Sequence, residues 1–283
     1  MLKISFFGKT DVGLERTNNE DAFSICPEKG FCLVADGMGG EAAGEVASRI
    51  FAETAVEVFS ETGGALEKIL GQISRLLGFP EKLPSNDLSS ETDSPVDAAK
   101  FSRSKEETLS LIECAFRLSN KRILKHVRQY PEHRGMGCTA ELLAFFNQGF
   151  VFGHIGDSRI YRFKDGECPQ ISRDHSFVQK QIDAGIISPE QARTHPYRNV
   201  ILRAVGIEKN LNPDFESGEI FPGDIFLLCS DGLSDMVEDM QIQEVLASED
   251  GLAEKADKLV DLAKAAGGVD NITLVLCEIS QDG

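Results

Sequence analysis

The spacing of apolar residues along the chain predicts both helices and strands. Apolar residues recur three and four positions apart over 41–59 and 108–127, which predicts two amphipathic helices. A third helix is predicted over 252–266. From residue 138 onward, shorter apolar runs bounded by turn residues predict strands at 138–146, 149–155, 159–163, 167–172, 215–220, 225–230 and 272–279. Tight turn signals between the first four of these strands predict an antiparallel meander.

Two segments interrupt this pattern. Residues 78–107 are rich in Ser, Pro, Asp and Glu and hold few large apolar residues, which predicts a flexible insertion. Residues 174–206 contain short helical pieces, with Ser188-Pro189 as a helix start and His195-Pro196 as a breaker. Because strands and helices otherwise occur in blocks, the pattern favours an α+β fold with antiparallel sheets.

Acidic residues flank four of the buried-looking strands. Asp36, Asp157 and Asp231 each end an apolar run, and Asp270 precedes one. A carboxylate beside a buried strand is costly unless positive charge lies opposite it. The glycines that follow Asp36 also let a ligand approach backbone carbonyl groups, and carboxylate and carbonyl oxygens suit a hard cation. Four such acids together predict one metal site at the edge of a core.

Charge and cysteine content restrict the partners and the compartment. A net charge of −17 and a pI near 4.7 argue against nucleic acid or an anionic membrane as a main partner. No apolar run approaches the length of a transmembrane helix, and the first ten residues lack the apolar region of a signal peptide. The seven cysteines are scattered without CxxC spacing, which is typical of core thiols. We therefore expect a cytoplasmic protein.

Other classes of site fit the sequence less well. Gly37, Gly39 and Ala42 satisfy a GxGxxA dinucleotide fingerprint, which makes nucleotide binding the main alternative. Asp36 would then face the pyrophosphate, and no second strand that ends in an acid follows the helix. No cysteine has an arginine six positions later, as a cysteine-based phosphatase requires, and the GxSxG of serine hydrolases is absent. Among these classes of site, metal-assisted hydrolysis is the one that the sequence still favours.

Seven motifs resemble those of one family and occur in its order. They are GLERTNNED, VADGMGG, GCTAELL, HIGDSRIYR, the long stretch from RDHSF to RAVG, LLCSDGLSDMV and DNITLVL. The chain is similar to the metal-dependent PP2C (PPM) family of protein serine/threonine phosphatases, bacterial branch, over nearly its whole length except about 78–107. The resemblance implies one domain over 1–283, a β-sandwich of two antiparallel sheets flanked by helices, and a small helical flap at 174–206.

The same resemblance implies a centre of two tightly bound Mn²⁺ or Mg²⁺ ions. Asp36 matches the carboxylate that bridges both ions, and Gly37 matches the carbonyl ligand of one. Asp231 and Asp270 match ligands of the other ion. A hydroxide bridging the two ions would attack the phosphorus of phosphoserine or phosphothreonine in proteins, so no protein nucleophile is required.

Three further residues have matches beside this centre. Glu20 matches the acid that holds metal-bound water, and Asp21 lies next to it in sequence. Asp157 matches a ligand of a third, weaker ion, and Arg16 matches the arginine that binds phosphate.

The implied partners are phosphorylated proteins and a serine/threonine kinase with the opposite activity, and a monomer is expected.

One position departs from the animal members of the family. Met38 stands where they carry the histidine proposed as the acid for the leaving group, as it does in bacterial relatives. His175 is a candidate for that role, although a structural hydrogen-bonding histidine is the favoured interpretation. A pseudophosphatase that only binds phosphoproteins is the rival function. Such a protein should have lost a metal-binding acid, and every one is present here. An active enzyme is therefore predicted.

Overall fold

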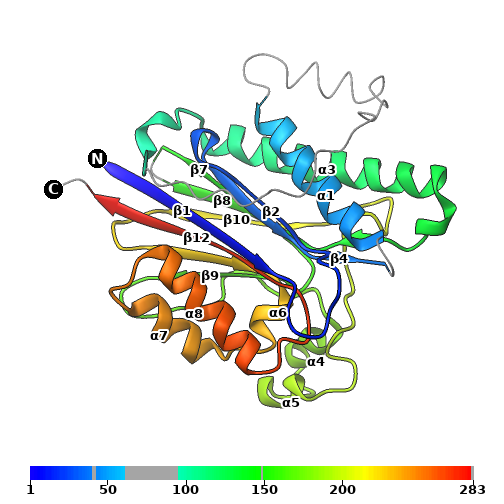
Figure 1. Cartoon of the computed structure of the whole chain (residues 1–283). Coiled ribbons are helices and arrows are strands. Elements are labelled where there is room, and N and C mark those ends of the chain that lie inside the picture. Colours follow the sequence, from blue (N-terminus) through cyan, green and yellow to red (C-terminus); the bar gives the residue numbers. More distant parts are fainter. Residues whose placement is uncertain (40–42, 61–94, 148, 282–283) are drawn as a thin grey trace.

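Two five-stranded antiparallel sheets pack face to face (Figure 1). The computed structural model describes residues 1–39, 43–60, 95–147 and 149–281. The first sheet has the order β5 (Val96–Asp97), β1 (Leu2–Asp11), β12 (Ile272–Gln281), β11 (Ile225–Cys229) and β9 (Arg159–Phe163). The second has the order β10 (Asp214–Glu219), β8 (Gly149–Ile155), β7 (Ala140–Phe146), β3 (Phe31–Ala35) and β2 (Ala22–Cys26). A separate pair joins β4 (Gly37–Met38) to β6 (Gly137–Cys138).

Helices cover the outer face of each sheet (Figure 1). The second sheet is covered by α1 (Ala43–Ser60) and α3 (Lys105–Gln129), and the first by α6 (Asp231–Ser234), α7 (Asp239–Ala247) and α8 (Leu252–Ala265). Two short helices, α4 (Phe177–Asp183) and α5 (Pro189–Arg193), stand apart at one end of the sandwich. Three 3₁₀ turns complete the described chain: η1 (Pro27–Lys29), η2 (Ala98–Lys100) and η3 (Pro131–His133). Within the described residues, no helix is long and apolar enough to cross a membrane.

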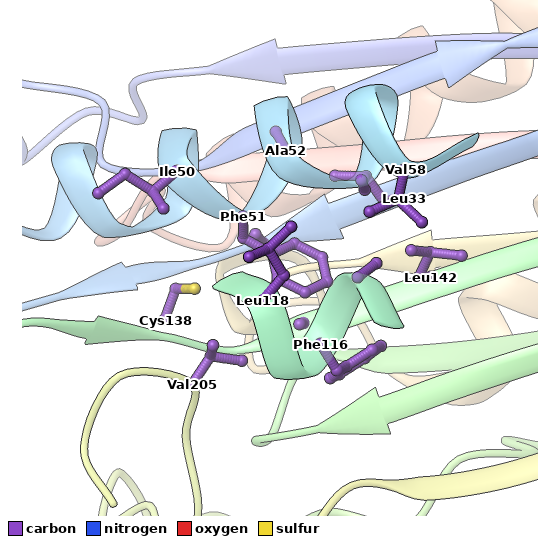
Figure 2. Packing of buried hydrophobic residues seen from close by; sticks show 14 of the residues in the cluster. Leu33, Ile50, Phe51, Ala52, Val58, Phe116, Leu118, Cys138, Leu142 and Val205 are labelled. Atoms are coloured by element: carbon purple, nitrogen blue, oxygen red, sulfur yellow. The ribbon is translucent and has the colours of Figure 1, made fainter. Parts of the chain in front are cut away.

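The apolar core has three layers. The middle layer lies between the sheets and is rich in phenylalanine. The second packs α1 and α3 against the second sheet, where Phe51 and Phe116 meet edge to face with ring centroids 5.1 Å apart (Figure 2). The third lies under α7 and α8. Because both faces of each sheet are covered, the central strands are buried along nearly their whole length, which matches their continuous apolar runs.

The predicted fold class is confirmed, and most predicted elements occur close to their predicted bounds. The helix predicted over 108–127 is α3, which begins earlier because the Ser104 hydroxyl accepts a hydrogen bond from the Glu107 amide and the Glu107 carboxylate accepts one from the Ser104 amide. Ser188 caps α5 and Pro189 opens it, as predicted from that dipeptide. Residues 41–42 of the first predicted helix lie outside the described residues.

The predicted meander is wrong beyond its first hairpin. β7 and β8 pair with each other, but β9 crosses to the other sheet and pairs with β11. The segment predicted as a strand at 167–172 makes only isolated bridges. Asp165 and Gly166 turn the chain tightly with positive φ angles of 52° and 85°, and Pro169 has no amide hydrogen for a ladder. The segment is therefore a short return along β9 and not a full strand.

The predicted insertion at 78–107 is also shorter than expected at its C-terminal end. Residues 78–94 lie outside the described part of the chain. Residues 95–107 hold β5, η2 and the first turn of α3. Ala98 and Phe101 are buried in the core layer between the sheets. A few apolar residues within a polar stretch are thus enough to attach this part to the fold.

Candidate metal centre

The four strand-end acids lie at one end of the sandwich. Asp36 follows β3 directly, and Asp157 follows β8 after one glycine. Asp231 begins α6 just after β11, and Asp270 stands two residues before β12. In antiparallel pairs such as β11 with β12, the end of one strand lies beside the start of its neighbour. This arrangement brings acids that are far apart in sequence to the same edge.

Their pKa shifts show that these acids are electrostatic neighbours. Burial raises the pKa of Asp36 well above its usual value, and the charges of Asp21, Asp231 and Asp157 raise it further. Burial likewise raises the pKa of Asp231 to about 6, with Asp235 and Asp270 adding to the shift. Negative charges that are forced together out of water favour protonation of one another. A bound cation would relieve this repulsion.

Asp36 is fixed through its backbone to Thr139, the residue just before β7. Its amide donates to the Thr139 hydroxyl oxygen at 2.9 Å, and its carbonyl oxygen accepts from the Thr139 amide at 2.8 Å. The Thr139 hydroxyl also lies 2.7 Å from that of Ser158, the residue after Asp157. Two of the strand-end acids therefore share one hydrogen-bonded support.

Asn271 organises the loop that carries Arg16 and Glu20. Its side-chain nitrogen donates to the carbonyl oxygens of Val12 and Asn18, and its side-chain oxygen accepts from the Glu20 amide at 2.8 Å. Burial raises the pKa of Glu20, against the lowering effect of the nearby Arg16. The predicted acid at position 20 is therefore held beside the strand start at Ile272.

Gly37 stands where the backbone of three segments comes close together. A Cβ atom at this position would lie 2.2 Å from the Gly44 carbonyl oxygen and 2.4 Å from that of Glu20. Contacts this short exclude any side chain, so only glycine fits. Gly37 also pairs with Cys138 in the small β4–β6 ladder, which connects the Asp36 turn to the segment before β7.

Arg16 and Asp21 both contact the acid cluster. Arg16 Nη2 donates to Asp270 Oδ2 at 2.7 Å, and the Arg16 side chain is about half exposed. Asp21 Oδ2 accepts a hydrogen bond from the Ser230 hydroxyl at 2.8 Å, next to Asp231. Burial and the neighbouring acids raise the pKa of Asp21 to about 8, although two hydroxyl hydrogen bonds oppose the shift. All eight predicted site residues thus lie at this end of the fold.

Two buried carboxylate oxygens indicate whether these residues would fit a cation. Oδ1 of Asp157 and Oδ1 of Asp231 are buried and have no hydrogen-bond partner. Unpartnered buried carboxylate oxygens fit hard cations such as Mn²⁺ or Mg²⁺, which take oxygen ligands. As placed, however, no three acidic, histidine or cysteine side chains in the described chain form a set that would hold an ion by themselves. The carboxylate oxygens lie at the same end of the fold, but they do not form a complete coordination site in this structure.

A cleft of about 420 Å³ opens between the acids and the two short helices. Asp157 and Asp231 line one side, and Arg193 and Arg198 from the predicted flap line the other. Asp235, which is not among the predicted site residues, also faces this cleft. The cleft is therefore strongly charged with both signs, and it places the flap beside the acid cluster.

His175 is built into the fold. Its Nδ1 accepts from the Gly156 amide at 3.2 Å, and its Nε2 lies 3.1 Å from Asp214 Oδ2. Burial, with the neighbouring His154, lowers the pKa of the ring to about 4. These contacts join the strand end before Asp157 to β10 and support the structural interpretation of this histidine.

The sequence pattern did not single out a buried pair beneath the cluster. His154 Nδ1 lies 2.6 Å from Glu141 Oε1, and both side chains are fully buried. His154 Nε2 donates to the Arg173 carbonyl oxygen at the start of the flap. A glutamate within the otherwise apolar run of β7 was the available signal, because a buried charge requires a partner.

Comparisons with known proteins agree with this geometry. A family profile described as Protein phosphatase 2C matches residues 15–272. The chain is 35% identical to the serine/threonine protein phosphatase PstP of Mycobacterium tuberculosis over 98% of its own length and 45% of that protein. It therefore spans about half of that relative. It is 32% identical to the protein phosphatase PhpP of Streptococcus pneumoniae over 96% of both chains.

Solved structures give the same result. The crystal structure of M. tuberculosis PstP superposes with a TM-score of 0.78 at 34% identity and covers 99% of this chain and 100% of that one. The catalytic domain of PstP in complex with two manganese ions superposes with a TM-score of 0.77 at 33% identity, with 99% and 100% covered. The prediction from the seven motifs is confirmed: the chain belongs to the protein phosphatase 2C family and resembles its bacterial serine/threonine phosphatases.

Proposed function

We propose that this protein is a metal-dependent phosphatase that hydrolyses phosphoserine and phosphothreonine in other proteins. The observation that carries the proposal is the buried acid cluster at the end of the sandwich. Oxygens of Asp157 and Asp231 lack hydrogen-bond partners there, and burial together with the neighbouring acids raises the pKa of Asp36. In a member of the protein phosphatase 2C family, such donors suit divalent cations.

Two tightly held Mn²⁺ or Mg²⁺ ions would be bound by Asp36, the Gly37 carbonyl group, Asp231 and Asp270. The relative PstP supports this number, because its catalytic domain has been solved with two manganese ions. When bound, such cations polarise phosphoryl oxygens and lower the pKa of water, so that the protein need not supply a nucleophile.

The residues around these ligands have supporting roles. Glu20 and Asp21 would orient water beside the two ions, and Asp157 would hold a third, weaker ion because it has fewer acidic neighbours on its own turn. Arg16 is half exposed beside Asp270, where its planar guanidinium group can turn to grip phosphate oxygens. In a chain of net charge −17, this arginine would offset the repulsion of the phosphate group.

We further propose a cytoplasmic monomer that opposes a serine/threonine kinase. All seven cysteines are free, which fits a reducing compartment. The high net charge favours separate molecules through mutual repulsion. A kinase is required by the chemistry, because phosphoserine and phosphothreonine arise by phosphoryl transfer to hydroxyl groups.

The proposal is tested by hydrolysis of a phosphoserine peptide after removal of bound metal. We expect no release of phosphate in chelator and recovery of turnover on addition of Mn²⁺ or Mg²⁺. Undiminished turnover in chelator would exclude a metal-dependent mechanism. Tight binding of the phosphopeptide without hydrolysis in saturating Mn²⁺ would instead identify a pseudophosphatase.

A further inference from the structure

A second cleft of about 420 Å³ is lined in part by residues that neighbour the strand-end acids in sequence. Most of its wall is apolar and comes from β4, the end of β8 and the segment that follows the flap helices. The apolar lining residues are Met38, Ile155, Ile201, Leu202, Ile207 and Leu211. We call this the apolar groove.

Two residues that line the apolar groove stand close in sequence to the strand-end acids. Met38 stands two residues after Asp36, and Ile155 stands two residues before Asp157. Two residues of extended chain span about 7 Å. Ile207 packs over Gly137, where an added Cβ would lie 3.0 Å from Ile207 Cδ1. Gly137 is also the ladder partner of Met38. The strand pair that carries Gly37 therefore forms one wall of the groove.

Two of the lining residues are exposed to an unusual degree for their type. Leu202 and Ile207 are 45% and 47% exposed, whereas Ile155 at the base of the groove is buried. The backbone at Leu202 is fixed, because its amide donates to the His175 carbonyl oxygen at 2.7 Å. An exposed apolar surface that is rigidly held next to a reactive site is typical of a binding surface.

The two clefts that border the acids differ in chemistry. The cleft under the flap helices is lined by arginines and aspartates, including Arg193, Arg198 and Asp235. The apolar groove holds two charged residues, Arg203 and Glu208, and Arg203 already pairs with Asp214 at 3.2 Å. An acidic side chain placed in the groove would lose water and find its cation already paired, whereas an apolar side chain would lose nothing.

We propose that the apolar groove binds an apolar side chain of the substrate protein, within about three residues of the phosphorylated serine or threonine. This inference rests on the proposed function. When the phosphate group reaches the acids, the neighbouring substrate residues must lie on the surface around them. An extended substrate segment that passes Met38 places a side chain over Leu202 and Ile207. The groove thereby selects phosphorylation sites with apolar neighbours.

The test compares three substrates in Mn²⁺: a phosphoserine peptide with leucines at the positions flanking the phosphoserine, the same peptide with glutamates there, and p-nitrophenyl phosphate. We expect kcat/KM to be about tenfold higher for the leucine peptide than for the glutamate peptide. Leu202→Ser and Ile207→Ser should each reduce this preference to about twofold or less, and kcat/KM for p-nitrophenyl phosphate should change much less.

Phe221→Ser is the matched control. Phe221 is 42% exposed and lies between β10 and β11, at the end of the sandwich opposite to the acids. The Phe221→Ser variant should keep the full preference for the leucine peptide. Thermal unfolding of each variant checks that the fold is intact.

The outcomes separate the two proposals. If wild-type protein hydrolyses the leucine and glutamate peptides with equal kcat/KM, the groove is not the binding site. The same conclusion follows if both groove variants keep the preference for the leucine peptide. Equal losses on all three substrates would also overturn the inference, because the side chains would then serve only the structure of the centre. If no substrate is hydrolysed in Mn²⁺, the proposed function itself fails.

Discussion

The middle of the sandwich and its acidic end are formed by the same strands but have opposite effects on the stability of the fold. Between the sheets, Phe226 packs edge to face with Phe145 and Phe150, with ring centroids 5.9 and 4.9 Å apart. A few residues further along β11 and β3, Asp231 and Asp36 are crowded together with raised pKa values. The first region stabilises the fold through buried apolar area, and the second opposes it through charge repulsion.

This difference shows where a fold can place a reactive site. The acids stand at strand ends, so the apolar interior of the strands remains continuous and offsets the repulsion at the edge. A site for cations thus costs stability locally while the core keeps the molecule folded. Substitutions in the two regions should therefore have opposite effects on stability and activity.

Asp36→Asn should have the largest effect on activity. Loss of one charged ligand at the centre of the cluster should lower kcat/KM for a phosphopeptide about a thousandfold, equivalent to about 4 kcal/mol. Stability in chelator should stay the same or rise, because the ionised Asp36 is buried among other acids. Activity assays with Mn²⁺ and thermal unfolding with chelator measure both. A variant with near-normal kcat/KM would remove Asp36 from the centre.

Phe101→Ala should show the reverse behaviour. Phe101 is buried in the layer between the sheets, and its removal should lower the free energy of unfolding by about 3–5 kcal/mol. At temperatures where the variant stays folded, its kcat should be unchanged. Urea denaturation gives the stability, with Phe221→Ala as the exposed control. A loss below about 1 kcal/mol would mean that the segment before α3 contributes little to the core.

The buried Glu141–His154 pair should make stability depend on pH. Burial disfavours the charged imidazolium, but the adjacent Glu141 carboxylate raises the pKa of His154 to about 9. Burial raises the pKa of Glu141 to about 7. In the unfolded chain the glutamate and the histidine lose their protons near pH 4.5 and 6.5, so the folded pair holds extra protons over about pH 4.5 to 9. Both raised pKa values make stability greatest below that range and lower as pH rises through it, by about 1.4 kcal/mol per unit for each extra proton.

Glu141→Gln tests this dependence. The glutamate carboxylate accepts a hydrogen bond from the protonated His154 Nδ1, whereas the glutamine amide can donate one to the neutral ring. The variant therefore no longer favours the charged ring, and the extra proton of the histidine is not bound. Denaturation at pH 6.5, 7.5 and 8.5 should show a smaller fall in stability for the variant than for wild-type protein. Parallel curves would show that this pair does not control the pH dependence.

Arg16→Ala should have the smallest effect on stability. The Arg16–Asp270 ion pair is exposed, with side-chain exposures of 49% and 32%, and such pairs contribute less than about 1 kcal/mol. If Arg16 binds phosphate, KM for a phosphopeptide should rise while the unfolding midpoint stays the same. An unchanged KM would make Arg16 a surface residue of no functional consequence.

The sequence indicated the candidate site more readily than the hydrogen bonds that hold it in place. Asp36 and Asp231 could be found because each ends an apolar run just before a glycine. The role of Thr139 depends on its contact with Asp36, more than a hundred residues away, and no local pattern encodes it. Asn271 follows a predicted ligand, yet its three contacts reach a loop near the start of the chain.

The errors in the fold have a similar origin. The hydrophobic pattern did not predict β1, where Gly8 and Lys9 interrupt the alternation in a strand that pairs with β12 along its whole length. The pattern also placed β9 in a meander, because the change of sheet after β8 depends on pairing with β11. Local periodicity identifies strands but does not reveal their partners.

The pairing of β1 with β12 has a mechanical consequence. Leu2 lies opposite Gln281, and Asp11 lies opposite Ile272 at the far end of the same ladder, so the two strand tips lie side by side in Figure 1. A force that pulls Leu2 and Gln281 apart acts across the strands and breaks their hydrogen bonds one after another. The acidic end would feel that load only after the pairs in between had separated.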